Sequence, residues 1–428
     1  MSHYKPYPAY KDSGVEWIGE VPEYWSVVRI KRAAQIATDR CNIIPAGLPY
    51  IGLEDVESGS GQYKPTATAS RQSDDSTVGL FQEGDVLYGK LRPYLRKCIA
   101  GRVDGACSTE FLILKPSLVS TNWLQNWLLT PDVTQQIEAG CDGAKMPRTD
   151  WEHVGSIHIP TPNKTEQDFI LAALDRETAR IDTLITRKIR FIELLKEKRS
   201  ALITHAVTKG LDPTVKMKDS GVEWIGEVPE HWQHSKVAWD MKMTIGWTPP
   251  TGNRSYYGGP HNWVSIADLS AGRVCNTKQT ITDKAVAEMR GTRAPAGSLL
   301  FSYKLSLGEV ALLEQPAYTN EAIAAFHPCK RVHMPFWKYA APVILPRYSR
   351  ENIYGSALLN QELMNSARMY LPEVVEQEAI AAAIDRETTR IDALIAKTQH
   401  SIDLLKERRA AFITAAVTGQ IDLRGEIA

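Results

Sequence analysis

The sequence predicts an α+β protein with an internal pseudo-twofold repeat, in which two globular domains are separated by two long coiled-coil helices that we expect to pair antiparallel. Three observations predict it. A short box occurs twice, a long amphipathic segment occurs twice, and the two stretches between them mix short strand-like runs with turn signals. The chain has 428 residues, which at about 100–200 residues per domain favours two or more domains.

The box is the first repeated element along the chain. Residues 11–25 read KDSGVEWIGEVPEYW and residues 218–232 read KDSGVEWIGEVPEHW, so the copies differ only at Tyr24 and His231. The resulting period of about 210 residues is far longer than the roughly 20–50 residues of a solenoid unit. The repeat therefore indicates duplication of a whole domain together with its helix.

The long amphipathic segment is the second repeated element. Residues 166–208 and 376–418 are identical at 26 of 43 compared positions, and their apolar residues recur at the steps of a helix seam. A helix of about 40 residues spans roughly 60 Å and does not stay folded alone, which favours packing of the two helices against each other. The seam residues expected to make this contact are Ile181, Ile185, Ile192, Leu195, Ile391, Ile395, Ile402 and Leu405. A plain spacer is the alternative to a partner-binding role.

The two stretches between the repeated elements, about 26–158 and 233–370, cannot be aligned convincingly with each other. Short apolar runs at 86–88 and 299–301 predict a strand in each. We call these two stretches the inserts, and the boxes with the long helical segments the frame. The similar frame segments suggest that the same partner binds twice. The divergent inserts suggest that each binds a different target. The expected boundaries are 1–158 for the first box and domain, 159–212 for the central helix, 213–370 for the second box and domain, and 371–428 for the distal helix and tail.

The charge is balanced overall, with 50 Lys+Arg and 50 Asp+Glu, which excludes a uniformly basic protein that coats nucleic acid. The second insert holds 15 Lys+Arg and 9 Asp+Glu, a net +6, whereas the first holds 14 and 15, a net −1. Positive charge in the first insert is therefore clustered. The cluster consists of Lys90, Arg92, Tyr94, Arg96 and Lys97. These residue types contact phosphates and base edges, and a solvated basic loop is the alternative.

No catalytic or metal site is predicted. Gly84, Gly89 and Lys90 fit the start of a phosphate-binding loop, but Leu91 stands where Ser or Thr is needed for magnesium. The 6 cysteines are scattered without a C-x-x-C pair, which argues against a zinc site or a disulfide framework. There is no run of about 18 apolar residues and no apolar signal core, so we expect a cytoplasmic location.

Taken together, these segments resemble the specificity subunit of type I restriction-modification systems. The matching pieces are the two boxes, the proline-then-EQ entries at 160–167 and 372–377, the ID(T/A)LI and LLKE(K/R)R helices, and the strand-loop motifs GDVLYGKLRPYLRK and LLFSYKLSLGEVA. The resemblance covers essentially the whole chain.

The resemblance implies a non-catalytic DNA-binding subunit. Each insert would be a target recognition domain that reads one half of a bipartite, asymmetric site in double-stranded DNA. The helices would set the spacer between the half-sites and dock two methyltransferase (modification) subunits, and a motor-nuclease (restriction) subunit would join the complex. S-adenosylmethionine and ATP would bind only to those partner subunits, so no cofactor is expected in this chain.

The resemblance also supplies candidate DNA contacts. The strand-loop motifs contribute Lys90, Arg92, Tyr94 and Lys97 in the first domain, and Tyr303 and Lys304 in the second. Lys145 and Arg148 are added because they lie in a polar loop before the first helix. The rival interpretation is a coiled-coil scaffold whose inserts bind proteins. Specific DNA binding that weakens steeply with salt would distinguish the two.

Overall fold

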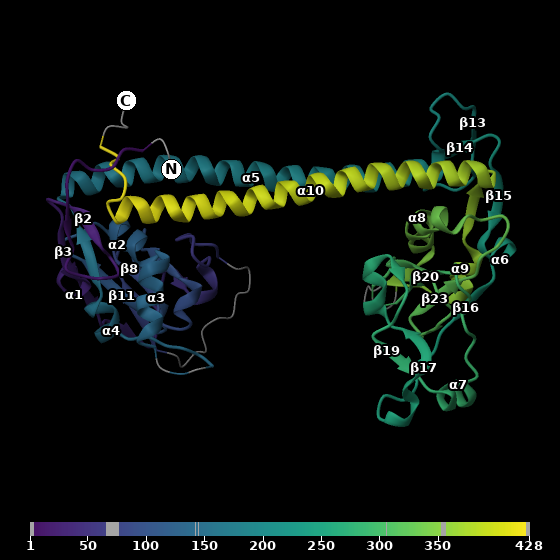
Figure 1. Cartoon of the computed structure of the whole chain (residues 1–428), viewed down its shortest axis with the longest axis horizontal. Coiled ribbons are helices and arrows are strands. Elements are labelled where there is room, and N and C mark those ends of the chain that lie inside the picture. The colour runs from purple at the N-terminus through teal and green to yellow at the C-terminus, as the bar shows by residue number, and fades with distance from the viewer. Residues whose placement is uncertain are drawn as a thin grey trace. The chain divides into compact units, whose positions relative to one another are not determined.

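A computed structural model describes residues 4–65, 77–141, 143, 145–304, 306–351 and 357–424. The chain divides into two compact units, one formed by Met1–Ile189 with Gln399–Ala428 and the other by Arg190–Thr398. Each unit contains one box, one insert and a part of each long helix (Figure 1). Within the described ranges, no helix has both the length and the apolar character needed to cross a membrane.

The two long helices are α5 (Lys164–Lys209) and α10 (Val374–Val417), which confirms the helices predicted at 166–208 and 376–418. In the first unit, Arg409 of α10 pairs with Asp182 of α5 at 3.0 Å. In the second unit, Arg199 of α5 pairs with Asp392 of α10 at 3.3 Å. The core of the first unit also holds Ile170 of α5 and Val417 of α10, and that of the second holds Val207 of α5 and Ile380 of α10, so the two helices run antiparallel within each unit. The two ion pairs are equivalent positions of the repeat.

The first insert contains two four-stranded sheets. One has the order β4-β11-β8-β9 and the other the order β5-β7-β10-β6. The strands are β4 (Ala34–Ala37), β5 (Arg40–Cys41), β6 (Tyr50–Ile51), β7 (Val78–Phe81), β8 (Val86–Gly89), β9 (Cys98–Ala100), β10 (Gly105–Ser108) and β11 (Phe111–Pro116). Helices α2 (Thr121–Leu128) and α3 (Pro131–Ala139) follow the last strand; α2 packs on β8, β9 and β11, and α3 packs on α2 and on the 3₁₀ turn at Pro93–Leu95.

The second insert repeats this arrangement. Its five-stranded sheet has the order β16-β23-β20-β21-β18, and a three-stranded sheet has the order β19-β17-β22. The elements are β16 (Met243–Ile245), β17 (Tyr257–Val264), β18 (Arg273–Val274), β19 (Gln279–Ile281), α7 (Asp283–Met289), β20 (Leu299–Ser302), β21 (Val310–Leu313), β22 (Tyr318–Thr319), β23 (Ile323–Phe326), α8 (Met334–Ile344), β24 (Arg350–Glu351) and β25 (Ala357–Leu358). The strands predicted at 86–88 and 299–301 are confirmed as β8 and β20.

The two inserts share a topology that direct sequence comparison did not show. In the first insert, β4 pairs with β11, β11 with β8 and β8 with β9, each time antiparallel. In the second insert, β16, β23, β20 and β21 pair in the same order and also antiparallel. A parallel pair also recurs, β6 with β10 in the first insert and β17 with β22 in the second. The α+β prediction is therefore confirmed, and the inserts are two versions of one fold.

Short strands at the two ends of each insert pair with each other, where the insert joins the box and the long helix. Strand β3 (Ser26–Arg29) pairs antiparallel with β12 (His158–Thr161), and β15 (Gln233–Lys236) pairs the same way with β26 (Arg368–Leu371). The remaining frame elements are β1 (Tyr10–Asp12), β2 (Glu20–Pro22), α1 (Ile30–Ala33), α4 (Trp151–Ser156), β13 (Met217–Asp219), β14 (Glu227–Pro229), α6 (Val237–Asp240) and α9 (Gln361–Ser366). Asp150 and Asn360 cap α4 and α9 with their side chains.

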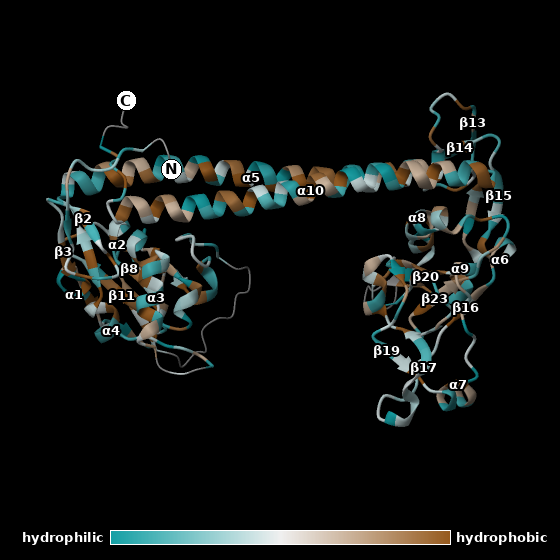
Figure 2. Ribbon diagram, in the orientation of Figure 1, coloured by the Kyte–Doolittle hydropathy of each residue, from teal (hydrophilic) through white to brown (hydrophobic). Residues whose placement is uncertain are grey.

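Each unit has its own apolar core, which joins the insert to both long helices. In the first unit, Trp25 of the box and Trp123 of α2 are fully buried beside Ile170 of α5 and Val417 of α10. The core of the second unit has the same plan, with Trp232, Trp337, Ile380 and Val207. Figure 2 shows apolar residues gathered inside both inserts and alternating with polar ones along α5 and α10. The cores explain why the repeated segments hold large aromatic residues.

Candidate nucleic-acid interface

A buried glutamine in the first turn of α5 anchors the first insert. Gln167 is 1% exposed, and its side-chain oxygen accepts a hydrogen bond from the backbone N–H of Ser120 at 2.8 Å. Its amide donates to the carbonyl of Pro162 at 3.0 Å. Ser120 is the N-cap residue of α2. One side chain therefore joins the start of α2 to the start of α5.

The second unit has the same anchor at the equivalent position. Gln377 is fully buried and accepts a hydrogen bond from the backbone N–H of His333, the N-cap residue of α8, at 2.8 Å. Its amide donates to the carbonyls of Arg331 and Pro372, each at 2.9 Å. A buried polar side chain is stable only when its groups are hydrogen-bonded, and both glutamines meet this condition. The repeated EQ pair in the sequence marks these two anchors.

The glutamate that precedes each glutamine binds the box. Glu166 accepts a hydrogen bond from the hydroxyl of Tyr24 at 3.2 Å. Glu376 contacts the ring nitrogen of His231 at 2.8 Å and accepts from the indole N–H of Trp232 at 3.1 Å. The boxes differ at one position, which is Tyr24 in the first box and His231 in the second. Each of these residues contacts the equivalent glutamate of its own unit. The frame therefore holds each insert in an equivalent way.

The candidate contact loop of the first domain, residues 90–97, follows β8 and lies against residues 147–149. The backbone N–H of Arg92 donates to the carbonyl of Pro147 at 2.8 Å, and Thr149 donates to Lys90 at 3.1 Å. These bonds bring together two segments about 50 residues apart in the sequence. The structure thus places the predicted contacts Lys90, Arg92 and Arg148 on neighbouring backbone, with Lys145 just before it.

The backbone of this loop is strained at two arginines. Arg92 has a φ of 52° and Arg96 a φ of 48°, on either side of a 3₁₀ turn at Pro93–Leu95. This left-handed conformation costs an L-residue with a side chain about 1–2 kcal/mol. Such strain gathers at functional sites, where the surrounding structure holds it in place. The two strained arginines therefore mark this loop as a candidate functional site.

The predicted contact residues of the first domain differ in how free their side chains are. Arg92 and Lys145 are exposed, and Tyr94 is 47% exposed. Lys90 is half-buried, and burial lowers the pKa of its ammonium group below the ordinary value. Arg92, Tyr94 and Lys145 are thus exposed, whereas Lys90 is not.

Two other predicted contacts are engaged within the protein. The Lys97 ammonium group donates to the carbonyl of Leu53 at 2.5 Å. Arg148 donates to both carboxylate oxygens of Glu110, at 2.8 and 2.9 Å. Both bonds come from Nη2, so they use one of the three nitrogens of the guanidinium. Their DNA-contact role stays a prediction.

In the second domain, the two predicted contacts lie just after β20. Tyr303 is 6% exposed, its hydroxyl donates to the carbonyl of Glu321 at 2.7 Å, and burial raises the pKa of that hydroxyl. Lys304 is exposed, with its ammonium group 5.6 Å from the centre of the Tyr303 ring. Lys304 is therefore the accessible member of this pair.

The near phosphate-binding loop does not form. The segment from Gly84 to Lys90 runs through β8, whose Leu87 and Tyr88 are fully buried in the sheet, so the backbone offers no cradle for a phosphate. The described residues also contain no group of three His, Cys, Asp or Glu side chains that could hold a metal ion.

The sequence interpretation missed a second loop of the first domain, residues 57–64. Loop 57–64 packs against loop 90–97, since the Gly59 N–H donates to the carbonyl of Arg96 at 3.2 Å. It also reaches the helices, since the Gln62 amide donates to Asp182 at 3.4 Å. Gly59 and Gly61 both have positive φ, so the run SGSG was a turn signal that could have drawn attention to it.

Comparison with known proteins agrees with this architecture. Residues 246–403 match the family model described as the type I restriction modification DNA specificity domain. The EcoDI specificity subunit of a type I restriction enzyme from Escherichia coli is 26% identical over 185 residues, 42% of this chain and 41% of that protein. The MjaIX specificity subunit from Methanocaldococcus jannaschii is 25% identical over 166 residues, 37% of this chain and 38% of that protein. The matches thus span about two fifths of the length of these curated relatives.

Solved structures show the same fold along nearly the whole chain. A chain from a study of complex assembly and conformational transition of the type I R-M system matches with a TM-score of 0.73 and 17% identity, covering 95% of this chain and 99% of that one. The HsdS subunit from Thermoanaerobacter tengcongensis matches with a TM-score of 0.54 and 17% identity, covering 94% and 98%. Residues 246–403 thus match the type I restriction modification DNA specificity domain, and the resemblance of the chain to type I specificity subunits is confirmed.

Proposed function

We propose that the whole chain is the DNA-binding specificity subunit of a type I restriction-modification complex. The observation that carries the proposal is the shared topology of the two inserts, because residues 246–403, which include most of the second insert, match a DNA specificity domain. Two domains of one fold with different sequences would read two different half-sites of double-stranded DNA. A protein-binding scaffold is not favoured, since nothing comparable supports it.

Local chemistry supports a contact between the first domain and DNA. Arg92 and Tyr94 are exposed on a strained loop next to a second polar segment that holds Lys145. Arginine can bind guanine in a bidentate manner, and lysine can bind a phosphate or a base edge. The accessible side chains therefore include groups for both positioning and base reading. In the second domain, Lys304 and the net charge of +6 over residues 233–370 support the same role.

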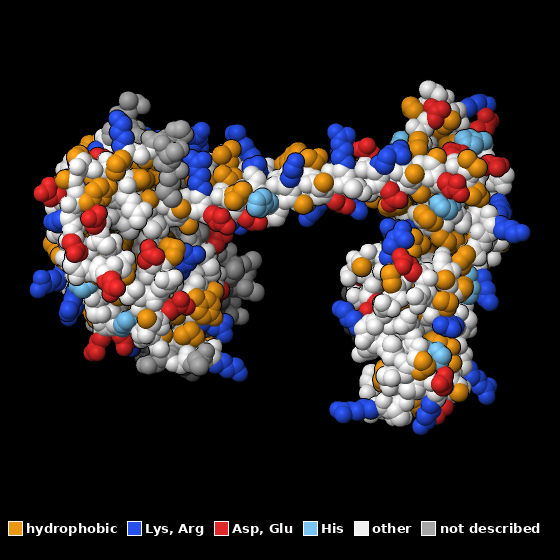
Figure 3. All heavy atoms as spheres, viewed as in Figure 1, with side chains coloured by type: hydrophobic (Ala, Val, Ile, Leu, Met, Phe, Trp, Pro, Cys, Tyr) orange, Lys and Arg blue, Asp and Glu red, His pale blue; other side chains and the backbone are white. Residues whose placement is uncertain are grey.

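The repeated helices support docking of the same partner twice. Several large apolar side chains of α5 and α10 are exposed, and two pairs of them are equivalent positions of the repeat. Leu184 and Leu394 are 39% and 40% exposed, and Leu194 and Leu404 are 46% and 50% exposed. Figure 3 shows apolar side chains among the charged ones along these helices. Exposed apolar groups at equivalent places fit two copies of one partner, which we propose to be the methyltransferase subunit.

The chain itself is proposed to be non-catalytic. The methyltransferase subunits would bind S-adenosylmethionine, and a motor-nuclease subunit would bind ATP. This chain would contribute only the choice of site and the geometry of the complex.

A mobility-shift experiment tests the proposal. The chain is purified together with its methyltransferase partner and titrated with duplex DNA that carries the site identified from methylated host DNA. We expect specific binding that weakens steeply with salt, because phosphate contacts release counterions. Replacing Arg92 by Ala should weaken binding by about 1–3 kcal/mol if its contact is to a base edge. Arg32→Ala, which removes an exposed arginine of α1 in the frame, is the control. Unchanged binding by a folded Arg92→Ala protein would remove that residue from the interface.

A further inference from the structure

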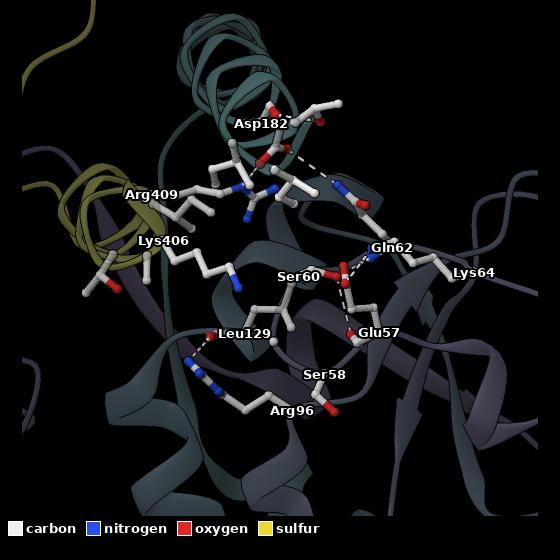
Figure 4. Close-up of a pocket in the computed structure, with 17 residues that line it drawn as sticks. Glu57, Ser58, Ser60, Gln62, Lys64, Arg96, Leu129, Asp182, Lys406 and Arg409 are labelled. Carbon is white, nitrogen blue, oxygen red and sulfur yellow. Dashed lines mark hydrogen bonds and ion pairs between the residues drawn. The ribbon is translucent and has the colours of Figure 1, made fainter. Parts of the chain in front are cut away.

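The first unit contains a cavity of about 430 Å³ that the proposed reading of bases does not use (Figure 4). On one side it is lined by residues of α5 and α10, and on the other by loop 57–64 and by Arg96 at the end of the contact loop. The helix side includes Asp182, Lys406 and Arg409. The cavity therefore lies where the recognition domain meets the helix pair of its own unit.

The carboxylates around the cavity already have cationic partners. Asp182 pairs with Arg409 at 3.0 Å, and Glu57 pairs with Lys64. Burial is the largest single influence on Glu57 and opposes its ionisation, but the hydrogen bonds from Lys64 and Ser60 and the charges of Lys64 and Lys406 together hold the pKa of that carboxyl below its ordinary value. Each of the two carboxylates therefore has a cationic neighbour.

Lys406 and Arg96 supply positive charge beyond these two pairs. Figure 4 shows Lys406 and Arg409 extending into the space from α10, and Arg96 on the opposite wall. The Arg96 guanidinium donates to the carbonyl of Leu129 at 3.4 Å, a long and weak bond that uses one of its five donors. With two neutralised pairs and two additional cations, the cavity has a net charge of about +2 and suits an anion.

The wall that carries Arg96 is held in shape by its neighbours. Gly59 lies close against the Arg96 side chain, so that a Cβ at this position would be 3.1 Å from the guanidinium. Gln62 ties the same loop to Asp182 of α5 at 3.4 Å. Loop 57–64 thus contacts both Arg96 and Asp182, and so joins the two walls of the cavity.

We propose that this cavity binds a phosphate group between Lys406 of α10 and Arg96 of the contact loop, with Arg409 contributing from the side. Guanidinium and ammonium groups are the usual protein ligands of phosphate. The phosphate could belong to the DNA backbone, an assignment that rests on the proposed function, or to a free phosphate compound. In either case its binding would join the recognition domain to α10.

The internal repeat provides a matched control for Lys406. Lys196 of α5 is its counterpart in the other LLKE motif, is exposed, and belongs to the second unit. Lys406→Ala and Lys196→Ala therefore remove the same charge from equivalent helix positions. Lys406→Arg keeps the charge and should retain binding.

Two measurements on the full chain with its methyltransferase partner separate the sources of phosphate. In the first, Tm is measured in inorganic phosphate and in chloride of equal ionic strength. A free phosphate ligand predicts a rise in Tm with phosphate concentration for wild type, Lys406→Arg and Lys196→Ala, but not for Lys406→Ala. In the second, duplex binding is measured against salt. A DNA phosphate predicts that Lys406→Ala alone weakens binding about threefold to tenfold and reduces the salt slope by about one.

Equal behaviour of Lys406→Ala and Lys196→Ala in both measurements would overturn the proposal. Its failure is distinguishable from failure of the proposed function. If wild type binds no duplex while phosphate still raises Tm through Lys406, the cavity binds free phosphate and the DNA-binding function is wrong. If wild type binds duplex specifically and neither measurement depends on Lys406, the function stands and the cavity proposal falls.

Discussion

The two units of this chain use the same frame to hold inserts that differ in sequence. Gln167 and Gln377 make equivalent buried hydrogen bonds, and the ion pair between Asp182 and Arg409 recurs at the equivalent positions of the other unit. The inserts share strand order but no convincing alignment. The residues that remained nearly identical are those that join insert to helix. Those that diverged include the surfaces proposed to face different DNA sequences.

The units differ most at the loops after β8 and β20. In the first unit, Arg92 and Tyr94 are exposed on a strained loop. In the second, the hydroxyl of Tyr303 is used inside the domain and Lys304 is exposed. Equivalent backbone positions therefore do not give equivalent side-chain roles. A motif shared by the two inserts locates the loop but not the contact within it.

The largest effect is expected from lengthening both helices together. Inserting one heptad after Ile189 and one after Thr398, where the two units divide, preserves the seam of the coiled coil. Seven residues add about 10 Å of helix, on the order of three base pairs. We expect the spacer of the methylated motif to lengthen and modification of the original site to be lost, while both half-sites stay the same. Sequencing of methylated DNA measures both. An altered half-site would show that the helices do more than set distance.

A smaller effect is expected from the two buried glutamines, and it tests whether the units are equivalent. Gln167→Ala and Gln377→Ala each leave buried backbone groups without partners, which should cost about 2–4 kcal/mol of unfolding free energy. Hydrogen exchange should rise around α2 for the first variant and around α8 for the second. Gln399→Ala, at an exposed position of α10, is the control and should cost about 0.5 kcal/mol or less. If only one of the two glutamine variants lowered the free energy of unfolding, the two glutamines would not have equivalent roles.

The smallest effect is expected at the ion pairs, where the units differ by one contact. Asp182→Asn and Asp392→Asn should each cost about 1 kcal/mol or less, because both pairs are partly exposed. Asp182 also accepts a hydrogen bond from Gln62 of loop 57–64. A double-mutant cycle should therefore show coupling between Gln62→Ala and Asp182→Asn but none between Gln62→Ala and Asp392→Asn. Equal coupling to both aspartates would contradict the assigned contact.

Much of the fold could be predicted from the sequence, because its signals are repeated. The seam of apolar residues predicted both long helices, and the apolar runs at 86–88 and 299–301 predicted the strands β8 and β20. The common topology of the inserts could not be predicted, because strand pairing depends on contacts between distant residues and tolerates many sequences. The engagement of Arg148 by Glu110 was hidden for the same reason, since the two residues lie 38 positions apart. Loop 57–64 has a turn signal, but its contact with α5 is set by tertiary packing.

Sequencing of methylated DNA from host cells with and without this gene tests the central claim most directly. If the chain chooses the site of modification through two different domains, one asymmetric bipartite motif should be methylated only when the gene is present. A Lys304→Ala variant should then relax the half of that motif opposite to the half affected by Arg92→Ala. A set of methylated motifs that does not change when the gene is removed would contradict the account.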